Sequence, residues 1–141
     1  MIILDTNVLS ALMRDQPDEA VVRWLDQQPR QSIWTTSITI LEIQFGIAVM
    51  ASGKRQRLLG EAFDQAIAEK LEHRVLAFDT NATQAAAVLM SKRQQQGRSG
   101  DLRDAMIAGI ALSNHATLAT RNARHFEDLT SPVMNPWEFT G

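Results

Sequence analysis

The sequence predicts an α/β sandwich, in which helices alternate with the four to five strands of a parallel sheet. Short apolar and β-branched runs alternate along the chain with longer segments rich in helix-forming residues. Strands separated by helices form βαβ units, whose right-handed crossovers join parallel strands. The chain has 141 residues, 45% of them hydrophobic, and no linker-like stretch, so we expect one domain over residues 1–141.

The first half of the chain is predicted to contain two strands and three helices. Each strand is a short apolar run, and each helix is rich in helix formers and bounded by Gly, Pro, Ser or Asp. In chain order they are strand 1–4, helix 6–14, helix 18–28, strand 32–37 and helix 39–51.

The second half repeats the alternation with three helices and two or three strands. In chain order they are helix 54–72, strand 74–78, helix 81–96, helix 101–115, strand 117–120 and the four-residue apolar segment 132–135. In an open sheet of this kind, ligands bind beyond the carboxyl ends of the strands. Candidate functional residues are therefore sought at that edge.

Composition excludes several classes of function. The chain has no cysteine, which rules out disulfide frameworks, thiolate metal sites and a cysteine nucleophile, and which fits a reducing cytoplasm. No apolar stretch approaches the roughly 18 residues of a membrane span, and a signal-peptide pattern is absent. The net charge is −2. A surface that binds phosphate must therefore be local, and we expect a cytoplasmic protein.

Three acidic residues stand in apolar surroundings, where an unpaired carboxylate is costly. Asp5 directly follows the first predicted strand. Glu42 is the only charged residue in residues 31–53, and Asp104 immediately precedes the apolar run 105–112. These three acids are the candidates for chemistry, whereas most other acids lie on polar helix faces.

Each of these acids also has a simpler structural interpretation. Asp5 could cap the helix that begins at Thr6 or Asn7. Thr39 and Glu42 have the spacing of a capping box, in which Glu42 would bond a backbone N–H at a helix start. Asp101 and Asp104 could be acids favoured at a helix N-terminus. For Asp101 we adopt that interpretation, and for Asp104 we do not, because it leads into a run that has no polar face.

Together the three acids indicate a hard-ligand metal site. Carboxylates that converge repel one another unless a cation neutralises them, and all-oxygen sites suit Mg²⁺ or Mn²⁺. Such an ion activates water and neutralises phosphoryl oxygens. The reaction that this chemistry indicates is hydrolysis of a phosphodiester.

Five motifs now make the chain similar to a known family. They are MIILDTNVLS at the start, TSITILEIQFGI at 36–47, DAMIAGIAL at 104–112, LATRNARHF at 118–126 and NPWEF at 135–139. In this order and spacing they resemble PIN-domain ribonucleases, and more narrowly the VapC and FitB type toxins of bacterial toxin-antitoxin pairs. The resemblance implies a three-layer α/β/α PIN-like fold with a central parallel sheet of four to five strands. It also implies an endoribonuclease with Mg²⁺ or Mn²⁺ bound by Asp5, Asp104 and Glu42, the last directly or through water.

The resemblance also implies partners. We expect an RNA substrate, a homodimer, and a small antitoxin of the VapB or FitA kind that inserts a basic side chain into the acidic pocket. A larger complex, with DNA bound through the antitoxin, is a further expectation. Two apolar helical stretches, residues 40–51 and 61–71, carry more hydrophobic residues than one small domain readily hides, as interfaces do.

The match departs from the family at one position. Many members carry an acid in the segment written here TRNARHF, where this chain has Asn122 and His125. Asparagine offers a carbonyl oxygen but no charge, so a second metal would bind more weakly. Supporting donors are expected from Thr6, Asn7 and Thr120.

Several basic residues near these motifs are candidates for RNA contact. Arg121 and Arg124 are the preferred ones because they flank the expected active-site edge. Lys92 and Arg93 have two open interpretations, a solvated helix end or a phosphate contact. The three tryptophans show no interleaving with basic residues, so we interpret them as core or interface residues.

Two other functions stay open. A phosphatase that forms an aspartyl phosphate also begins with an Asp after the first strand, but its pattern is D-x-D, and Asn7 stands at the second position. A catalytically weakened PIN-like module that only binds RNA or a partner is the other alternative, which Asn122 keeps open. Cleavage of RNA without hydrolysis of phosphomonoesters would distinguish the nuclease from both.

Overall fold

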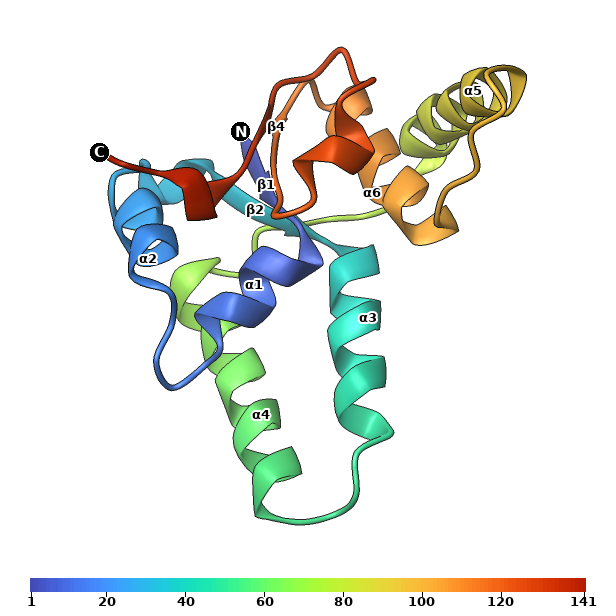
Figure 1. The fold of residues 1–141 in the computed structure, drawn as a ribbon. Helices are drawn as coiled ribbons and strands as arrows, with labels where there is room; N and C mark the ends of the chain where they lie inside the picture. The colour runs from blue at the N-terminus through green and yellow to red at the C-terminus, as the bar shows by residue number, and fades with distance from the viewer.

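Five parallel strands form one sheet between two layers of helices in the computed structural model, which describes residues 1–141 (Figure 1). The sheet order is β3-β2-β1-β4-β5. The strands are β1 Ile2–Leu4, β2 Ile33–Thr36, β3 Val75–Leu76, β4 Thr117–Ala119 and β5 Val133–Met134. The three-layer fold and its parallel sheet are thus confirmed, with the larger of the two expected strand numbers.

Six α-helices cover the sheet. They are α1 Thr6–Leu12, α2 Glu19–Asp26, α3 Ser37–Ala48, α4 Lys54–Gln65, α5 Thr80–Gln95 and α6 Leu102–Ser113. Short 3₁₀ helices follow β4 and β5 and are named η3 (Ala123–Phe126) and η4 (Pro136–Glu138). No helix of the structure has both the length and the apolar character needed to cross a membrane.

The core consists of two groups of buried apolar side chains, one on each face of the sheet. Successive residues of β1 point to opposite faces, so Leu4 joins the group under α1, α2 and α4, and Ile3 joins the group under α5 and α6. Helix α3 contributes to both, through Ile43 and Ile38 respectively. The start of α3 is therefore fixed at the edge of the sheet, where Glu42 lies.

Helices α5 and α6 pack unusually closely at Gly109. A Cβ atom at this position would lie 2.5 Å from the carbonyl oxygen of Ala82 and 2.8 Å from the Cβ of Ala86. Only glycine permits this approach. The close packing fixes α6, and with it Asp104, against the long helix α5.

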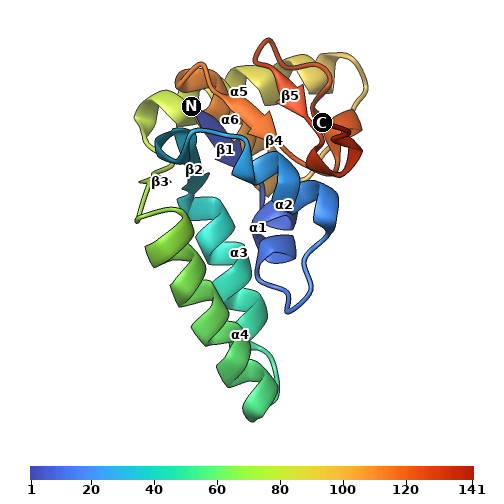
Figure 2. The same cartoon turned by 90° about the vertical axis from the view of Figure 1, so that its left-hand side faces the viewer.

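Helices α3 and α4 run side by side away from the sheet as an arm (Figure 2). Three apolar side chains at intervals of four residues are exposed along α3, with exposed fractions of 58% at Leu41, 60% at Phe45 and 66% at Val49. This apolar face of α3 confirms that the first of the two apolar stretches is not hidden within the domain.

Among the predicted elements that are shorter than expected, two have a direct structural reason. The strand predicted at 74–78 is only Val75–Leu76, because its partner β2 ends at Thr36 and gives way to α3. The helix predicted at 54–72 ends as a π turn over Ala66–Lys70. That wider turn places Ala66 and Leu71 on the same side, where both are buried in the core.

Candidate active site

Asp5 lies at the carboxyl end of β1, in the centre of the sheet edge. Its backbone N–H donates to the carbonyl oxygen of Ala119 at 2.9 Å, which extends the pairing of β1 with β4. Its carboxylate accepts from the Thr6 N–H at 2.8 Å and from the Thr120 hydroxyl at 2.7 Å. Asp5 is thus the N-cap of α1, and its side chain has two firm hydrogen-bond donors although only 4% of the residue is exposed.

Burial raises the pKa of the Asp5 carboxyl group above its ordinary value. The hydrogen bonds from Thr120 and Thr6 lower it, and the charges of Asp104 and Glu42 raise it again. The ionised form of Asp5 is therefore disfavoured in the protein as it stands. A cation placed beside this carboxylate would oppose the shift by favouring the ionised form.

Glu42 reaches the same edge from α3 and is held there by threonines. The Thr6 hydroxyl donates to Glu42 Oε1 at 3.1 Å and lies 3.0 Å from the Thr39 hydroxyl. Arg103 Nη1 lies 3.8 Å from Glu42 Oε2. Through Thr6, whose N–H binds Asp5 and whose hydroxyl binds Glu42, the two acids are joined by a single residue.

The alternative interpretation of Thr39 and Glu42 as a capping box is wrong. Helix α3 begins two residues earlier than expected, at Ser37, and its N-cap is Thr36, which accepts from the Thr39 N–H at 3.1 Å. The earlier N-cap places Thr39 inside the first turn. The Glu42 side chain is therefore free of the helix start and extends toward Thr6 instead.

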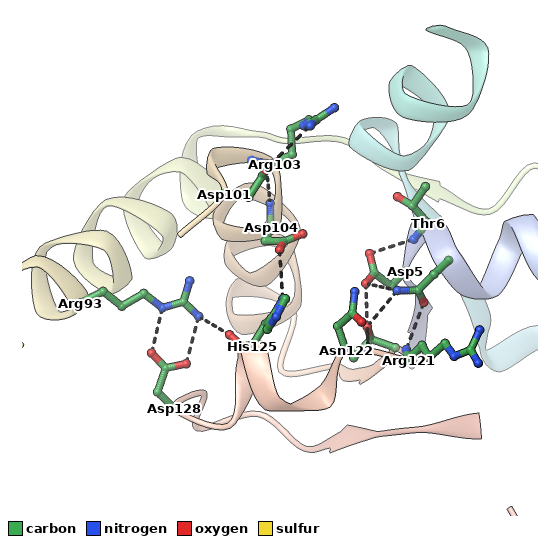
Figure 3. A network of polar contacts seen from close by, with 12 residues as sticks. Asp5, Thr6, Arg93, Asp101, Arg103, Asp104, Arg121, Asn122, His125 and Asp128 are labelled. Atoms are coloured by element: carbon green, nitrogen blue, oxygen red, sulfur yellow. Dashed lines mark hydrogen bonds and ion pairs between the residues drawn. The ribbon is translucent and has the colours of Figure 1, made fainter. Parts of the chain in front are cut away.

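Asp104 lies in the first turn of α6, where Asp101 is the N-cap as expected. Its carboxylate is 31% exposed and lies 3.8 Å from His125 Nδ1 (Figure 3). Burial raises the pKa of Asp104, the charge of Asp101 raises it further, and His125, Arg93 and Arg103 oppose the shift. The apolar run that follows Asp104 is buried as predicted, which orients this acid toward the site rather than into solvent.

The three acids do not form the closed cluster that we expected from converging carboxylates. No group of three acidic or histidine side chains is arranged as a ready set of metal ligands. Glu42 and Asp104 each turn toward a basic neighbour, Arg103 and His125 respectively. Repulsion between carboxylates opposes a closed cluster, and the Arg103 guanidinium offers Glu42 a favourable partner instead.

The segment after β4 completes the edge. The Asn122 N–H donates to Thr120 Oγ1 at 3.0 Å, and the Arg121 N–H donates to Asn7 Oδ1 at 3.1 Å. Asn7 Nδ2 in turn lies 3.4 Å from Asp5 Oδ2. The backbone of this segment is thereby tied to Asp5 through the predicted supporting residues, while the Asn122 side chain stays exposed (Figure 3).

Arg93 is neither a solvated helix end nor a phosphate contact, so both interpretations are wrong. It is only 7% exposed and forms a two-point ion pair with Asp128, with Nε to Oδ2 at 2.8 Å and Nη2 to Oδ1 at 3.0 Å. Nη2 also donates to the His125 carbonyl oxygen at 3.0 Å. We name these three residues the Arg93 clamp, because they fasten η3 to α5. Lys92 is exposed, as a solvated helix end would be.

Sequence reasoning missed the threonines that hold Glu42. Thr36 and Thr39 are fully buried, and their hydroxyls lie 3.4 Å apart in a chain that continues to Thr6. The run of polar β-branched residues in an otherwise apolar segment was the available signal. Nothing local in the sequence indicated that Arg103 would pair with Glu42.

The family follows from comparison with known sequences. Residues 2–131, most of the chain, match the PIN domain. The chain belongs to the PIN-domain family. Its fold, with a five-stranded parallel sheet and six helices, is a PIN-like α/β fold.

PIN-domain relatives match over nearly their whole length. Plasmid stability protein StbB of Pseudomonas syringae is 41% identical over 138 residues, which is 98% of this chain and 99% of the relative. VapC ribonuclease Y4jK of Sinorhizobium fredii is 36% identical over the same shares of both chains. Toxin FitB of Neisseria gonorrhoeae is 35% identical over 137 residues, covering 97% of this chain and 99% of the toxin.

Solved structures of the PIN type are also similar. The structure of FitAB bound to an IR36 DNA fragment has a TM-score of 0.88 and 34% identity, covering 100% of this chain and 99% of that one. FitAcB from Neisseria gonorrhoeae has the same TM-score and identity, with 99% and 100% coverage. Those two structures contain a toxin of this fold.

Proposed function

We propose that the protein is a metal-dependent endoribonuclease, built as a single PIN-like domain over residues 1–141, and the cytoplasmic toxin of a toxin-antitoxin pair. The observation that carries this proposal is Asp5, a buried carboxylate whose pKa is raised and which shares one sheet edge with Glu42 and Asp104. The names of the relatives, a VapC ribonuclease and the toxin FitB, support it.

The donor set fits a divalent cation. Asp5, Asp104 and Glu42 offer only carboxylate oxygens, the ligands that Mg²⁺ and Mn²⁺ prefer. Burial first, and then the charges of Asp104 and Glu42, raise the pKa of Asp5. We propose that Asp5 and Asp104 hold the ion and that Glu42 assists, directly or through water. When bound, such an ion supplies an activated water and neutralises phosphoryl charge.

The other residues of the site position these acids and the RNA. Thr6 and Thr120 fix both oxygens of Asp5, and Thr6 also holds Glu42. Arg121 and Arg124 form no ion pair with any acid of the chain, so their guanidinium groups are available for phosphate oxygens. We propose that they hold the RNA backbone.

The test is RNA cleavage by purified protein that has been freed of any partner. We expect cuts in total RNA with Mg²⁺ or Mn²⁺, none with a chelator, and no hydrolysis of a phosphomonoester such as p-nitrophenyl phosphate. Mapping the product ends identifies the cut positions. RNA binding without cleavage in either metal would favour the weakened binding module, and monoester hydrolysis would favour the phosphatase.

A small antitoxin and a second copy of the chain are the proposed partners. FitAB, whose toxin resembles this chain, was solved on DNA, which supports an antitoxin that also carries the complex to DNA. The apolar face of α3 is suited to the contact between two copies, since an exposed apolar stripe is otherwise costly in water. A basic side chain of the antitoxin would meet the acids of the site.

We predict that Phe45→Glu separates the homodimer. A charge at the centre of the apolar face of α3 would have to be buried unpaired in the interface, which opposes association. Light scattering should give a dimer mass for the parent and a monomer mass for the variant. The exposed substitution Gln44→Glu adds the same charge beside the stripe and should leave the dimer intact. A parent that is monomeric at every concentration would contradict the prediction.

Asn122→Asp tests whether position 122 belongs to the metal site. An added carboxylate should strengthen metal binding, yet without metal it adds like-charge repulsion. We therefore expect the variant to melt at a lower temperature than the parent in chelator and to gain more from added Mn²⁺. Unchanged melting curves in both conditions would place the residue 122 side chain outside the site.

A further inference from the structure

Arg121 is stacked on an aromatic ring at the edge of the candidate site. Its guanidinium carbon lies 4.9 Å from the centroid of the Trp137 ring. Trp137 belongs to η4, which packs on α2, and the ring is partly buried against the core on that side. The guanidinium group therefore lies over the tryptophan ring, and Arg121 as a whole is exposed.

A single asparagine holds the two partners in place. Asn135 Oδ1 accepts from the Trp137 N–H at 2.9 Å, and Asn135 Nδ2 lies 3.4 Å from the Arg121 carbonyl oxygen. The other side of Arg121 is fixed by its N–H bond to Asn7, which also contacts Asp5. The Arg121 backbone is thus two hydrogen bonds from the central acid of the site (Figure 3).

The stacked guanidinium has no polar partner of its own. No hydrogen bond or ion pair engages its nitrogens, whereas Arg103, the arginine beside Glu42, is paired with two acids. A planar cation supported on one face by tryptophan offers its other face to a second flat group and its edge donors to oxygen. Nucleic-acid bases stack on such arginine planes in single-stranded RNA sites.

We propose that Arg121, supported by Trp137, is a stacking subsite for one unpaired RNA base next to the phosphate that is cut. This inference rests on the proposed ribonuclease function and adds to it a preference for unpaired nucleotides. A base within a duplex has both faces covered by its neighbours, so it cannot occupy the subsite. The subsite recognises a base by its flat face, which every base has. It therefore selects single-stranded over double-stranded RNA and has little preference for the base sequence.

The test measures binding, without metal, of a fluorescent single-stranded oligoribonucleotide and of copies that carry one abasic position each. The protein is the Asp5→Asn variant, so that cleavage does not interfere. We expect one abasic position to weaken binding about tenfold, the size of one lost stacking contact. Adding Arg121→Lys, which keeps the charge but removes the plane, should abolish the difference between intact and abasic RNA.

Arg124→Lys is the matched control, because Arg124 is an exposed arginine of the same segment without an aromatic partner. It should keep the full abasic effect. Trp137→Leu should also abolish the difference between intact and abasic RNA. Because Trp137 also packs on α2, the melting temperature of this variant is measured in parallel. The exposed Arg121→Lys variant carries the test if Trp137→Leu does not fold.

The inference fails if Arg121→Lys keeps the same abasic effect as its parent, or if no abasic position matters. A rival ligand for the Arg121 side chain is an acidic peptide, whose binding is measured with the same variants. The inference also fails if Arg121→Lys weakens the binding of this peptide and leaves RNA binding unchanged. Failure of the proposed function looks different, because it is the absence of cleavage by the unmodified protein in Mg²⁺ or Mn²⁺. Cleavage without any abasic effect would retain the function and remove the subsite.

Discussion

The Asp5→Asn variant is expected to lose RNA cleavage by about 100-fold or more and, in chelator, to unfold at a higher temperature than the parent. The loss of activity follows from removing the carboxylate at the centre of the proposed metal site. The gain in stability follows from the raised pKa of Asp5, because the folded protein disfavours the charge that this residue carries at neutral pH.

Asparagine can replace the two short hydrogen bonds of the Asp5 side chain, with the bond to Thr120 reversed in direction. Its carbonyl oxygen can accept from the Thr6 N–H, and its amide can donate to the Thr120 hydroxyl. The variant therefore removes the charge and retains the N-cap of α1. Added Mn²⁺ should stabilise the parent more than the variant, since a ligand that binds only the folded state raises its stability.

The stability difference should depend on pH in a defined direction. Between the ordinary aspartate pKa of 3.8 and the raised value, folded protein holds more protons at Asp5 than unfolded protein does. The contribution of Asp5 to the free energy of unfolding thus falls as pH rises through that window. Melting curves in chelator should show the largest gain for Asp5→Asn at neutral pH and a vanishing gain near pH 3.8.

An exposed acid provides the control for both readouts. Asp64→Asn removes the same charge from the surface of α4 and should change neither cleavage nor the pH dependence of melting. A cleavage rate of Asp5→Asn equal to that of the parent would refute the catalytic role. A lower melting temperature of Asp5→Asn than of the parent in chelator would show that the hydrogen bonds of the Asp5 carboxylate outweigh the cost of burying its charge.

Breaking the Arg93 clamp is expected to produce the largest loss of stability. Arg93→Met leaves Asp128 without its two-point partner in a mostly buried setting, which costs about 3 kcal/mol. Arg98 remains 3.1 Å from Asp128 and keeps the loss from being greater. The same change frees the His125 carbonyl oxygen, so η3 should also exchange its amide hydrogens faster.

Urea denaturation measures this loss, with Lys92→Met as the control. Lys92 is the preceding residue of α5, is exposed and forms no ion pair, so its replacement should be nearly neutral. Asp128→Asn should also destabilise, because Arg93 holds the pKa of Asp128 below its usual value. Equal midpoints for Arg93→Met and Lys92→Met would mean that the clamp contributes nothing.

Local patterns were sufficient to predict the fold and to nominate Asp5, Glu42 and Asp104. Each acid interrupts or borders an apolar run, and a parallel sheet places the ends of its strands at one edge. The start of α3 was predicted wrongly because two threonines, Thr36 and Thr39, can each begin a helix, and only tertiary packing decides between them.

Pairings between distant residues could not be predicted in the same way. Arg93 and Asp128 are 35 residues apart, and the solvated ends of helices carry the same residue types as buried clamps. Trp137 and Arg121 likewise meet only because β5 returns the chain beside β4. Composition and periodicity carry no information on contacts between residues that are distant in sequence. The Arg93 clamp and the pair of Arg121 and Trp137 are therefore visible only in the three-dimensional structure.

The order of the strands differs from the order in which a ribosome makes them. β1 is among the first residues synthesised, yet one of its two neighbours in the sheet is β4, which is translated after all six α-helices. Asp5 Oδ2 therefore gains its short hydrogen bond, from the Thr120 hydroxyl, only late in synthesis. A growing chain that lacks β4 contains the acid without the edge that orients it. We therefore expect a chain that ends before β4 to lack RNA cleavage activity, because its first acid lacks the neighbouring strand β4 to orient it.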